Sequence, residues 1–168
     1  MITITKILCP VDFLPASDAA VHYAADLAAK YNATIHLLHV ITPIAGGTYE
    51  YVVDTTEMMK SIQESTIQDM NNLAAKLKAE GVVAESEVRI GDVDDEIQQA
   101  IGVIKPDLVV MGTHGRTGAQ RWHMGSTTKN LLRHSFVPLV IITPRRREPD
   151  RTQSRLRADF TTLAALMP

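Results

Sequence analysis

Short apolar runs alternate with segments of helical periodicity along most of this 168-residue chain. The runs are rich in β-branched residues and predict buried strands at about 4–11, 33–40, 82–90, 107–111 and 137–143. The segments between them predict helices at about 15–31, 56–80, 93–104 and 125–134. Strands that alternate with helices pair in parallel, and right-handed crossovers place helices on both faces of an open sheet. The chain therefore predicts a three-layer α/β sandwich.

The topology of such a sheet indicates where a ligand binds. Ligands of open parallel sheets lie outside the carboxyl ends of the strands, at the point where the strand order reverses. For a five-stranded parallel sheet of order 3-2-1-4-5, that point lies between the first and fourth strands. The first strand ends in Pro10-Val11-Asp12 and the fourth in Met111-Gly112, so these two segments predict a cleft.

A glycine motif follows the fourth strand. Two residues separate its first two glycines, and nine more precede a Gly-Ser-Thr triplet: Gly112, Gly115, Gly125, Ser126 and Thr127. Glycines let backbone N–H groups approach phosphate oxygens and permit positive φ angles, and the start of a helix attracts an anion. Arg116 and Lys129 could neutralise further phosphate charge. The motif predicts a bound nucleotide, and an ordinary strand-to-helix turn with a serine cap is the competing interpretation.

The chain lacks the sequence motifs of two common classes of ATP-driven enzyme. No GxxxxGK[ST] sequence occurs in the chain, and no SGGxDS follows the first strand. His114 lies between two glycines and is the natural general base, although the turn requires its backbone rather than its ring. Asp12 either accepts hydrogen bonds from a base amine or a ribose hydroxyl, or caps the first helix near Ser17 and Asp18. The remaining prediction is a site that holds a nucleotide without an evident catalytic group.

The spacing GxxG, nine residues, then G[ST] is the signature of the universal stress proteins. Other stretches are similar to the same family: Ile7-Leu8-Cys9-Pro10-Val11-Asp12, Leu37-Leu38-His39-Val40, Gly91-Asp92 and Pro138-Leu139-Val140-Ile141-Ile142. The resemblance covers residues 1 to about 144. It implies a flavodoxin-like sandwich of the adenine nucleotide alpha hydrolase-like kind and, because the glycine signature is intact, the ATP-binding branch of the family.

The resemblance also implies roles for individual residues. Asp12 resembles the carboxylate at the adenine and ribose end. The base pocket would be lined by Pro10, Val11 and Val40, and the ribose and phosphates would be held by Met111, Gly112, Gly115, Gly125, Ser126 and Thr127. We add His114 and Arg116 of the intervening loop as candidate nucleotide-binding residues. The expected ligand is ATP, with Mg²⁺ on its phosphates.

Composition and charge are those of an ordinary soluble domain, with 45% hydrophobic and 21% charged residues. The single cysteine, Cys9, excludes an intrachain disulfide and a cysteine-based zinc site, and it fits a reducing compartment. Without a recognisable export signal or an apolar run of membrane-spanning length, we expect a cytoplasmic protein with no membrane span. An acidic body argues against nucleic acid as a partner.

The last residues differ from the rest of the chain. Residues 1–144 form the expected universal stress protein domain, whereas residues 145–168 carry six arginines against three acidic residues. Apolar residues recur there at helical spacing: Leu156, Phe160, Leu163 and Met167. We expect a basic linker followed by a short amphipathic segment, which docks on its own dimer or frays. The alternatives are a docking helix for an unidentified protein partner and a contact with an anionic membrane or nucleic acid.

The predicted last strand, residues 138–143, lies at an edge of the expected sheet. An exposed apolar edge invites pairing, and pairing with its own copy about a twofold axis would cover it. The chain therefore predicts a homodimer, which the family resemblance also implies.

Two groups of polar residues resemble metal sites, and a structural role suits both better. His36 and His39 lie three apart on a predicted strand and so point to opposite faces. The acidic run after Gly91 fits the cap and first turn of a helix, whose dipole favours negative charge. Our leading hypothesis is an ATP-binding regulatory protein whose occupancy changes the loops around residues 41–55 and 113–124. The alternatives are a slow ATP hydrolase and a nucleotide-independent dimeric interaction module.

Overall fold

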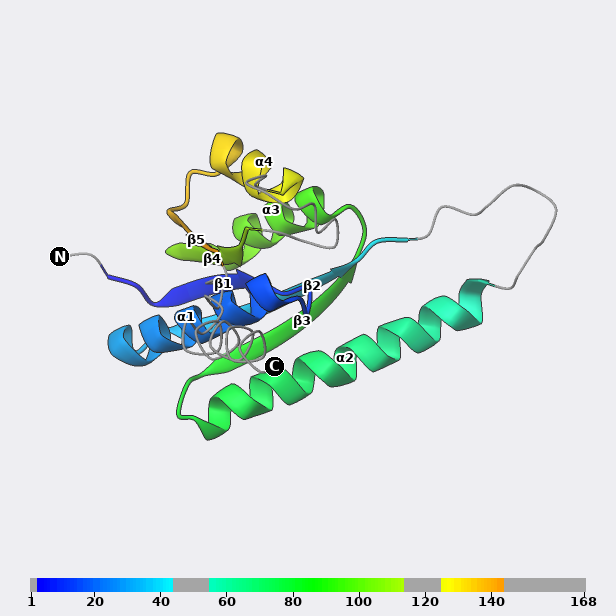
Figure 1. The fold of residues 1–168 in the computed structure, drawn as a ribbon, viewed down its shortest axis with the longest axis horizontal. Helices are drawn as coiled ribbons and strands as arrows, with labels where there is room; N and C mark the ends of the chain where they lie inside the picture. The colour runs from blue at the N-terminus through cyan, green and yellow to red at the C-terminus, as the bar shows by residue number, and fades with distance from the viewer. Residues whose placement is uncertain (1–2, 44–54, 114–124, 144–168) are drawn as a thin grey trace, which may run out of the picture.

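The computed structural model describes residues 3–43, 55–113 and 125–143, and its elements follow the predicted order (Figure 1). They are β1 (Lys6–Pro10), α1 (Pro15–Tyr31), β2 (Thr34–Ile41), α2 (Thr55–Ala79), β3 (Ala84–Ile90), α3 (Val93–Ile104), β4 (Leu108–Gly112), α4 (Ser126–His134) and β5 (Leu139–Ile142). Neighbouring strands pair in parallel in the order β3-β2-β1-β4-β5. The predicted fold class and strand order are confirmed. Most of the predicted 41–55 loop, most of the glycine loop and the predicted C-terminal segment lie outside the described residues.

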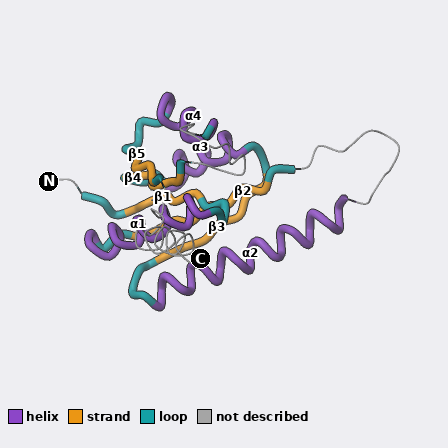
Figure 2. The backbone as a smooth tube through the Cα atoms, viewed as in Figure 1, coloured by secondary structure: helices purple, strands orange, loops and turns teal. Residues whose placement is uncertain are grey.

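The sheet is the middle of three layers, with α1 and α2 on one face and α3 and α4 on the other (Figure 2). Along β1, Ile7 and Cys9 belong to the core under α1 and α2, while Leu8 belongs to the core under α3 and α4. A strand covered on both faces needs apolar side chains at every position. Burial raises the pKa of the Cys9 thiol to about 12, which agrees with the core position predicted for it.

Helix α1 approaches the sheet closely because its buried face consists mainly of small residues. They are Ala16, Ser17, Ala20, Val21, Ala24 and Ala28. Leu14 is the N-cap, and Pro15 occupies the first helical position, where its missing N–H removes no hydrogen bond. The start of α1 therefore lies directly against the end of β4.

Helix α2 is longer than the strand it covers. Its 25 residues span roughly 37 Å, whereas the seven residues of β3 span roughly 23 Å. Met70, Ala74 and Leu77 are buried, but the N-terminal part of α2 reaches past the end of β3 (Figure 1). Ile67, in the middle of the helix, is 40% exposed. After the helix, Gly81 adopts a φ of +86°, the left-handed conformation in which many helices end at a glycine.

The start of α3 and the edge position of the last strand also follow prediction. The Asp92 side chain caps α3 by accepting the N–H groups of Asp94 and Asp95 at 2.9 and 3.3 Å. Strands β3 and β5 are the sheet edges, and all four residues of β5 are half-buried. Over the described ranges, no helix has the length and apolar character needed to cross a membrane.

Candidate functional site

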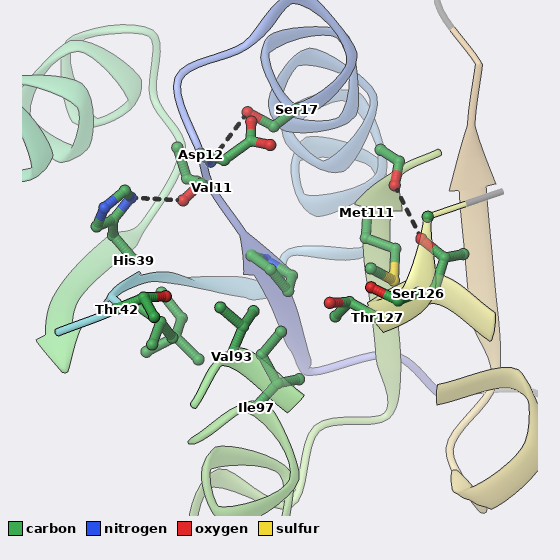
Figure 3. Close-up of a pocket in the computed structure, with 16 residues that line it drawn as sticks. Val11, Asp12, Ser17, His39, Thr42, Val93, Ile97, Met111, Ser126 and Thr127 are labelled. Carbon is green, nitrogen blue, oxygen red and sulfur yellow. Dashed lines mark hydrogen bonds between the residues drawn. The ribbon is translucent and has the colours of Figure 1, made fainter. Parts of the chain in front are cut away.

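A pocket of about 270 Å³ opens at the carboxyl ends of β1, β2 and β4, between α3 and the start of α4 (Figure 3). The strands and the turns after them contribute Pro10, Val11, Asp12, Leu38, His39, Val40, Thr42, Met111 and Gly112. The helices and their flanks contribute Ser17, Val93, Ile97, Gly125, Ser126, Thr127 and Thr128. The pocket lies where the strand order reverses between β1 and β4, as topology predicted.

The two ends of the pocket differ in chemistry. Val93 and Ile97 reach into it from α3 and form an apolar wall with Val40, whereas Ser126 and Thr127 lie beside the end of β4 (Figure 3). An apolar wall with a few convergent polar groups is the usual composition of a small-molecule site. The arrangement suits a ligand with a flat apolar part and a polar or anionic part.

The Asp12 carboxylate is held in place by a local turn. Its Oδ1 accepts the N–H of Leu14 at 3.0 Å, while the Asp12 N–H donates to the Ser17 Oγ at 3.2 Å. The carboxylate therefore fixes the turn before α1 and does not cap the helix near Ser17 and Asp18, the alternative role considered from the sequence. Within the described residues Asp12 makes no further hydrogen bond, so its Oδ2 can still accept one from a ligand.

The turn after β1 is also braced from β2. The buried His39 places Nδ1 2.7 Å from the carbonyl oxygen of Val11, and a carbonyl can only accept, so Nδ1 carries the proton. Phe13, whose φ is +60°, lies with its ring centroid 5.3 Å from that of His39. A left-handed aromatic residue is uncommon and persists only where its surroundings fix it. These contacts hold Val11 and Asp12 at the pocket.

The start of α4 offers hydrogen-bond donors to the pocket. The first helical bond runs from the Lys129 N–H to the Gly125 carbonyl at 3.1 Å, so the N–H groups of residues 126–128 have no acceptor within the helix. Gly125 has no side chain to cap them. The hydroxyls of Ser126 and Thr127 border the same space, and the helix dipole adds partial positive charge. Lys129 is exposed and does not line the pocket.

Gly112 is required by helix packing. A Cβ atom at this position would lie 2.7 Å from the backbone carbon of Ala16 and 2.8 Å from its carbonyl oxygen. Among the glycines of the described residues, positive φ occurs at Gly81 and not at Gly112. The expectation that Gly112 serves phosphate approach and a positive φ therefore missed its main constraint, which is the contact between β4 and α1.

Comparison with known proteins agrees with this geometry. A model of the universal stress protein family matches residues 3–143. The chain belongs to the universal stress protein family. Universal stress protein MJ0531 of Methanocaldococcus jannaschii is 26% identical over 149 residues, which cover 85% of this chain and 84% of that protein.

Solved structures of universal stress proteins share the fold. UspA from Lactobacillus plantarum superposes with a TM-score of 0.72 at 24% identity, covering 83% of this chain and 98% of that one. A universal stress protein from Arabidopsis thaliana with AMP bound has a TM-score of 0.62 at 22% identity and covers 88% of this chain and 98% of its own. At these identities the likeness establishes the fold alone.

The structure brings nine of the twelve predicted site residues together around the pocket of this universal stress protein. They are Pro10, Val11, Asp12, Val40, Met111, Gly112, Gly125, Ser126 and Thr127. The other three, His114, Gly115 and Arg116, lie outside the described residues. Contact of any of the twelve with a nucleotide stays a prediction.

Several lining residues were missed from the sequence. Thr42 follows the carboxyl end of β2 and could have been found by the rule that located Asp12. Val93 and Ile97 lie four residues apart and so share one face of α3, but nothing in the sequence says which helix face borders the pocket. No group of three or more His, Cys, Asp or Glu in the described ranges is arranged to hold a metal ion.

Proposed function

We propose that this universal stress protein belongs to the ATP-binding branch of its family and is a regulatory or stress-response protein controlled by an adenine nucleotide in this pocket. The observation that carries the proposal is the pairing of an apolar wall and a carboxylate with a helix start rich in donors, inside one pocket. Each part matches one part of a nucleotide: base, ribose and phosphate. The AMP bound to the Arabidopsis relative is a ligand of this class.

The proposed ligand lies with its base against Val40, Val93 and Ile97. Its ribose hydroxyls donate to the open oxygen of Asp12, and its phosphates accept hydrogen bonds from the N–H and O–H groups at the start of α4. Mg²⁺ would enter with the phosphates, because Asp12 is the one carboxylate that lines the pocket among the described residues. The ion would neutralise phosphate charge.

Nucleotide recovered from the protein tests this proposal. The purified protein is denatured and the released small molecules are identified by mass spectrometry, followed by calorimetric titration with ATP, AMP and GTP, each with and without Mg²⁺. We expect ATP or AMP to bind more tightly than GTP. Release of ADP alone would point to slow hydrolysis instead, and failure of every nucleotide to bind would overturn the proposal and leave an interaction module.

We also propose that the protein is a cytoplasmic homodimer paired through β5. The half-buried side chains of this edge strand support pairing, and the free thiol of Cys9 is compatible with a reducing compartment. Val140→Asp should shift the mass measured by light scattering from dimer to monomer. Val88→Asp is the matched control, because Val88 is also half-buried against the same core but lies on the opposite edge strand, β3. A Val140→Asp protein that stays dimeric would exclude this interface.

A further inference from the structure

The two helices that wall the pocket are joined by a hydrogen bond between residues distant in the sequence. The Asn130 Nδ2 of α4 donates to the Asp94 Oδ2 of α3 at 2.8 Å, and the contact is partly buried. An ionised carboxylate only accepts, so the Asn130 amide must present its N–H₂ group. Within the described residues no other side-chain hydrogen bond or ion pair joins α3 to α4. The two helices lie side by side above the sheet (Figure 1).

Each partner lies close to pocket-lining residues. Asp94 directly follows the lining residue Val93 and lies less than one helical turn before the lining residue Ile97. Asn130 lies one helical turn after Ser126. The bond therefore connects the apolar wall with the donor-rich end of the pocket.

Each helix is otherwise fixed to the sheet by contacts of its own. Arg89 of β3 lies 3.5 Å from the Glu96 carboxylate of α3. Leu131 of α4 is buried, and the Thr128 hydroxyl donates to the Gly112 carbonyl at 3.3 Å. Breaking the bond between the helices should therefore leave both helices folded while releasing the restraint on their separation.

We propose that Asp94 and Asn130 are positioning residues, a clasp that sets the distance between the two ends of the nucleotide site. This inference rests on the proposed function. A ligand that spans both ends needs the two walls at one spacing, so a looser spacing lowers the fraction of binding-competent protein and its apparent affinity. A ligand that occupies only the apolar end is indifferent to that spacing. Loss of the clasp should therefore weaken ATP and spare adenosine.

An exchange of the two side-chain types tests the clasp. Asn130→Asp sets two carboxylates against each other, and we expect the affinity for ATP, measured by calorimetry, to fall about tenfold, the loss that follows from one broken charge-assisted hydrogen bond. Asp94→Asn keeps an acceptor and should change the affinity less than about threefold. The double variant N130D/D94N restores the bond with donor and acceptor reversed, and it should bind ATP within about threefold of the wild type.

The double variant also distinguishes loss of the hydrogen bond from direct repulsion between a carboxylate at position 130 and the phosphates. It keeps the carboxylate at position 130, so simple repulsion between that charge and the phosphates would leave it as weak as the single Asn130→Asp variant, and this result would overturn the clasp. An equal loss of adenosine and ATP affinity in the single variant would overturn it too, since a merely structural role harms both. Wild-type protein that binds neither ligand instead refutes the proposed function itself.

Discussion

Two carboxylates at opposite ends of the same sheet do different things. Asp107, before β4, accepts three hydrogen bonds at Oδ2. Two come from Thr5, from its N–H at 2.7 Å and its hydroxyl at 2.8 Å, and one comes from the N–H of Lys6 at 3.0 Å. These bonds, chiefly those from Thr5, favour the ionised form and hold the pKa of Asp107 below its ordinary value. Asp12, after β1, accepts one bond at 3.0 Å from the described residues.

The contrast separates polar groups that the fold uses from polar groups that it leaves available. At the amino end of the sheet, Asp107 ties the start of β4 to the start of β1. At the carboxyl end, the Asp12 carboxylate and the start of α4 retain capacity to bind. Polar groups with spare capacity beside an apolar wall are the physical mark of a binding site. Substitutions at the two ends should therefore separate stability from nucleotide affinity.

The largest expected effect is a loss of folding stability, caused by a substitution in the lining of the pocket. Gly112→Ala brings a Cβ within 3 Å of the Ala16 backbone, which cannot rotate away, so we expect the free energy of unfolding in urea to fall by about 2 kcal/mol. Gly102→Ala is the matched control, because its Cβ would meet nothing within 4 Å on α3. That control should gain about 0.5–1 kcal/mol from helix propensity. Equal stability of the two variants would contradict the packing explanation.

Gly112 also marks the limit of what the sequence predicts. The apolar runs and the helical periodicity are local patterns in the sequence. They predicted all nine helices and strands within a few residues of their observed bounds. The contact with Ala16 joins residues 96 positions apart, so no local pattern contains it. The glycine spacing thus led to residues that line the pocket, but it did not reveal that packing against Ala16 requires the first glycine.

The same limit explains the other missed features. His39 was assigned a structural role, but its bond to Val11 depends on how β2 lies beside β1. The side of α3 that borders the pocket depends on how that helix packs on β1 and β2. The length of α2 was predicted, but its overhang beyond β3 follows from comparing two elements that pack together only in three dimensions. Sequence patterns identified the rim of the pocket, whereas its apolar wall required the fold.

Ser126→Asp should next separate binding from stability. A carboxylate in the first turn of α4 interacts favourably with the helix dipole, so the melting temperature should stay the same or rise slightly. The same charge repels phosphate, and we expect the affinity for ATP, measured by calorimetry, to fall by tenfold or more, about 1.4 kcal/mol. Adenosine carries no phosphate and is the ligand control. An equal loss of adenosine affinity would show that the phosphates do not lie at this end.

Asp12→Asn tests the other end with a smaller effect. The amide oxygen can still accept the Leu14 N–H, so stability should change little. Loss of the charged acceptor should weaken ATP by about fivefold, about 1 kcal/mol. The preference for ATP over 2′,3′-dideoxy-ATP should shrink in this variant if Asp12 binds the ribose. A preference that equals that of the wild type would remove Asp12 from the ribose end.

Asp107→Asn should have the smallest effect, which is a change in how folding stability depends on pH. Because the folded-state pKa of Asp107 lies below the unfolded value, its ionised form stabilises the protein fully above the ordinary carboxyl range, and this stability is lost as pH falls through the folded-state pKa. The wild type should therefore exceed Asp107→Asn in stability by about 0.5 kcal/mol near pH 6, a small difference because the carboxylate is exposed and screened by solvent. Urea unfolding at pH 6 and at pH 3 should show the gap narrowing in acid, while ATP affinity near pH 6 stays equal in the two proteins. A changed affinity would mean that the two ends of the sheet are coupled, and the separation drawn between Asp12 and Asp107 would then be wrong.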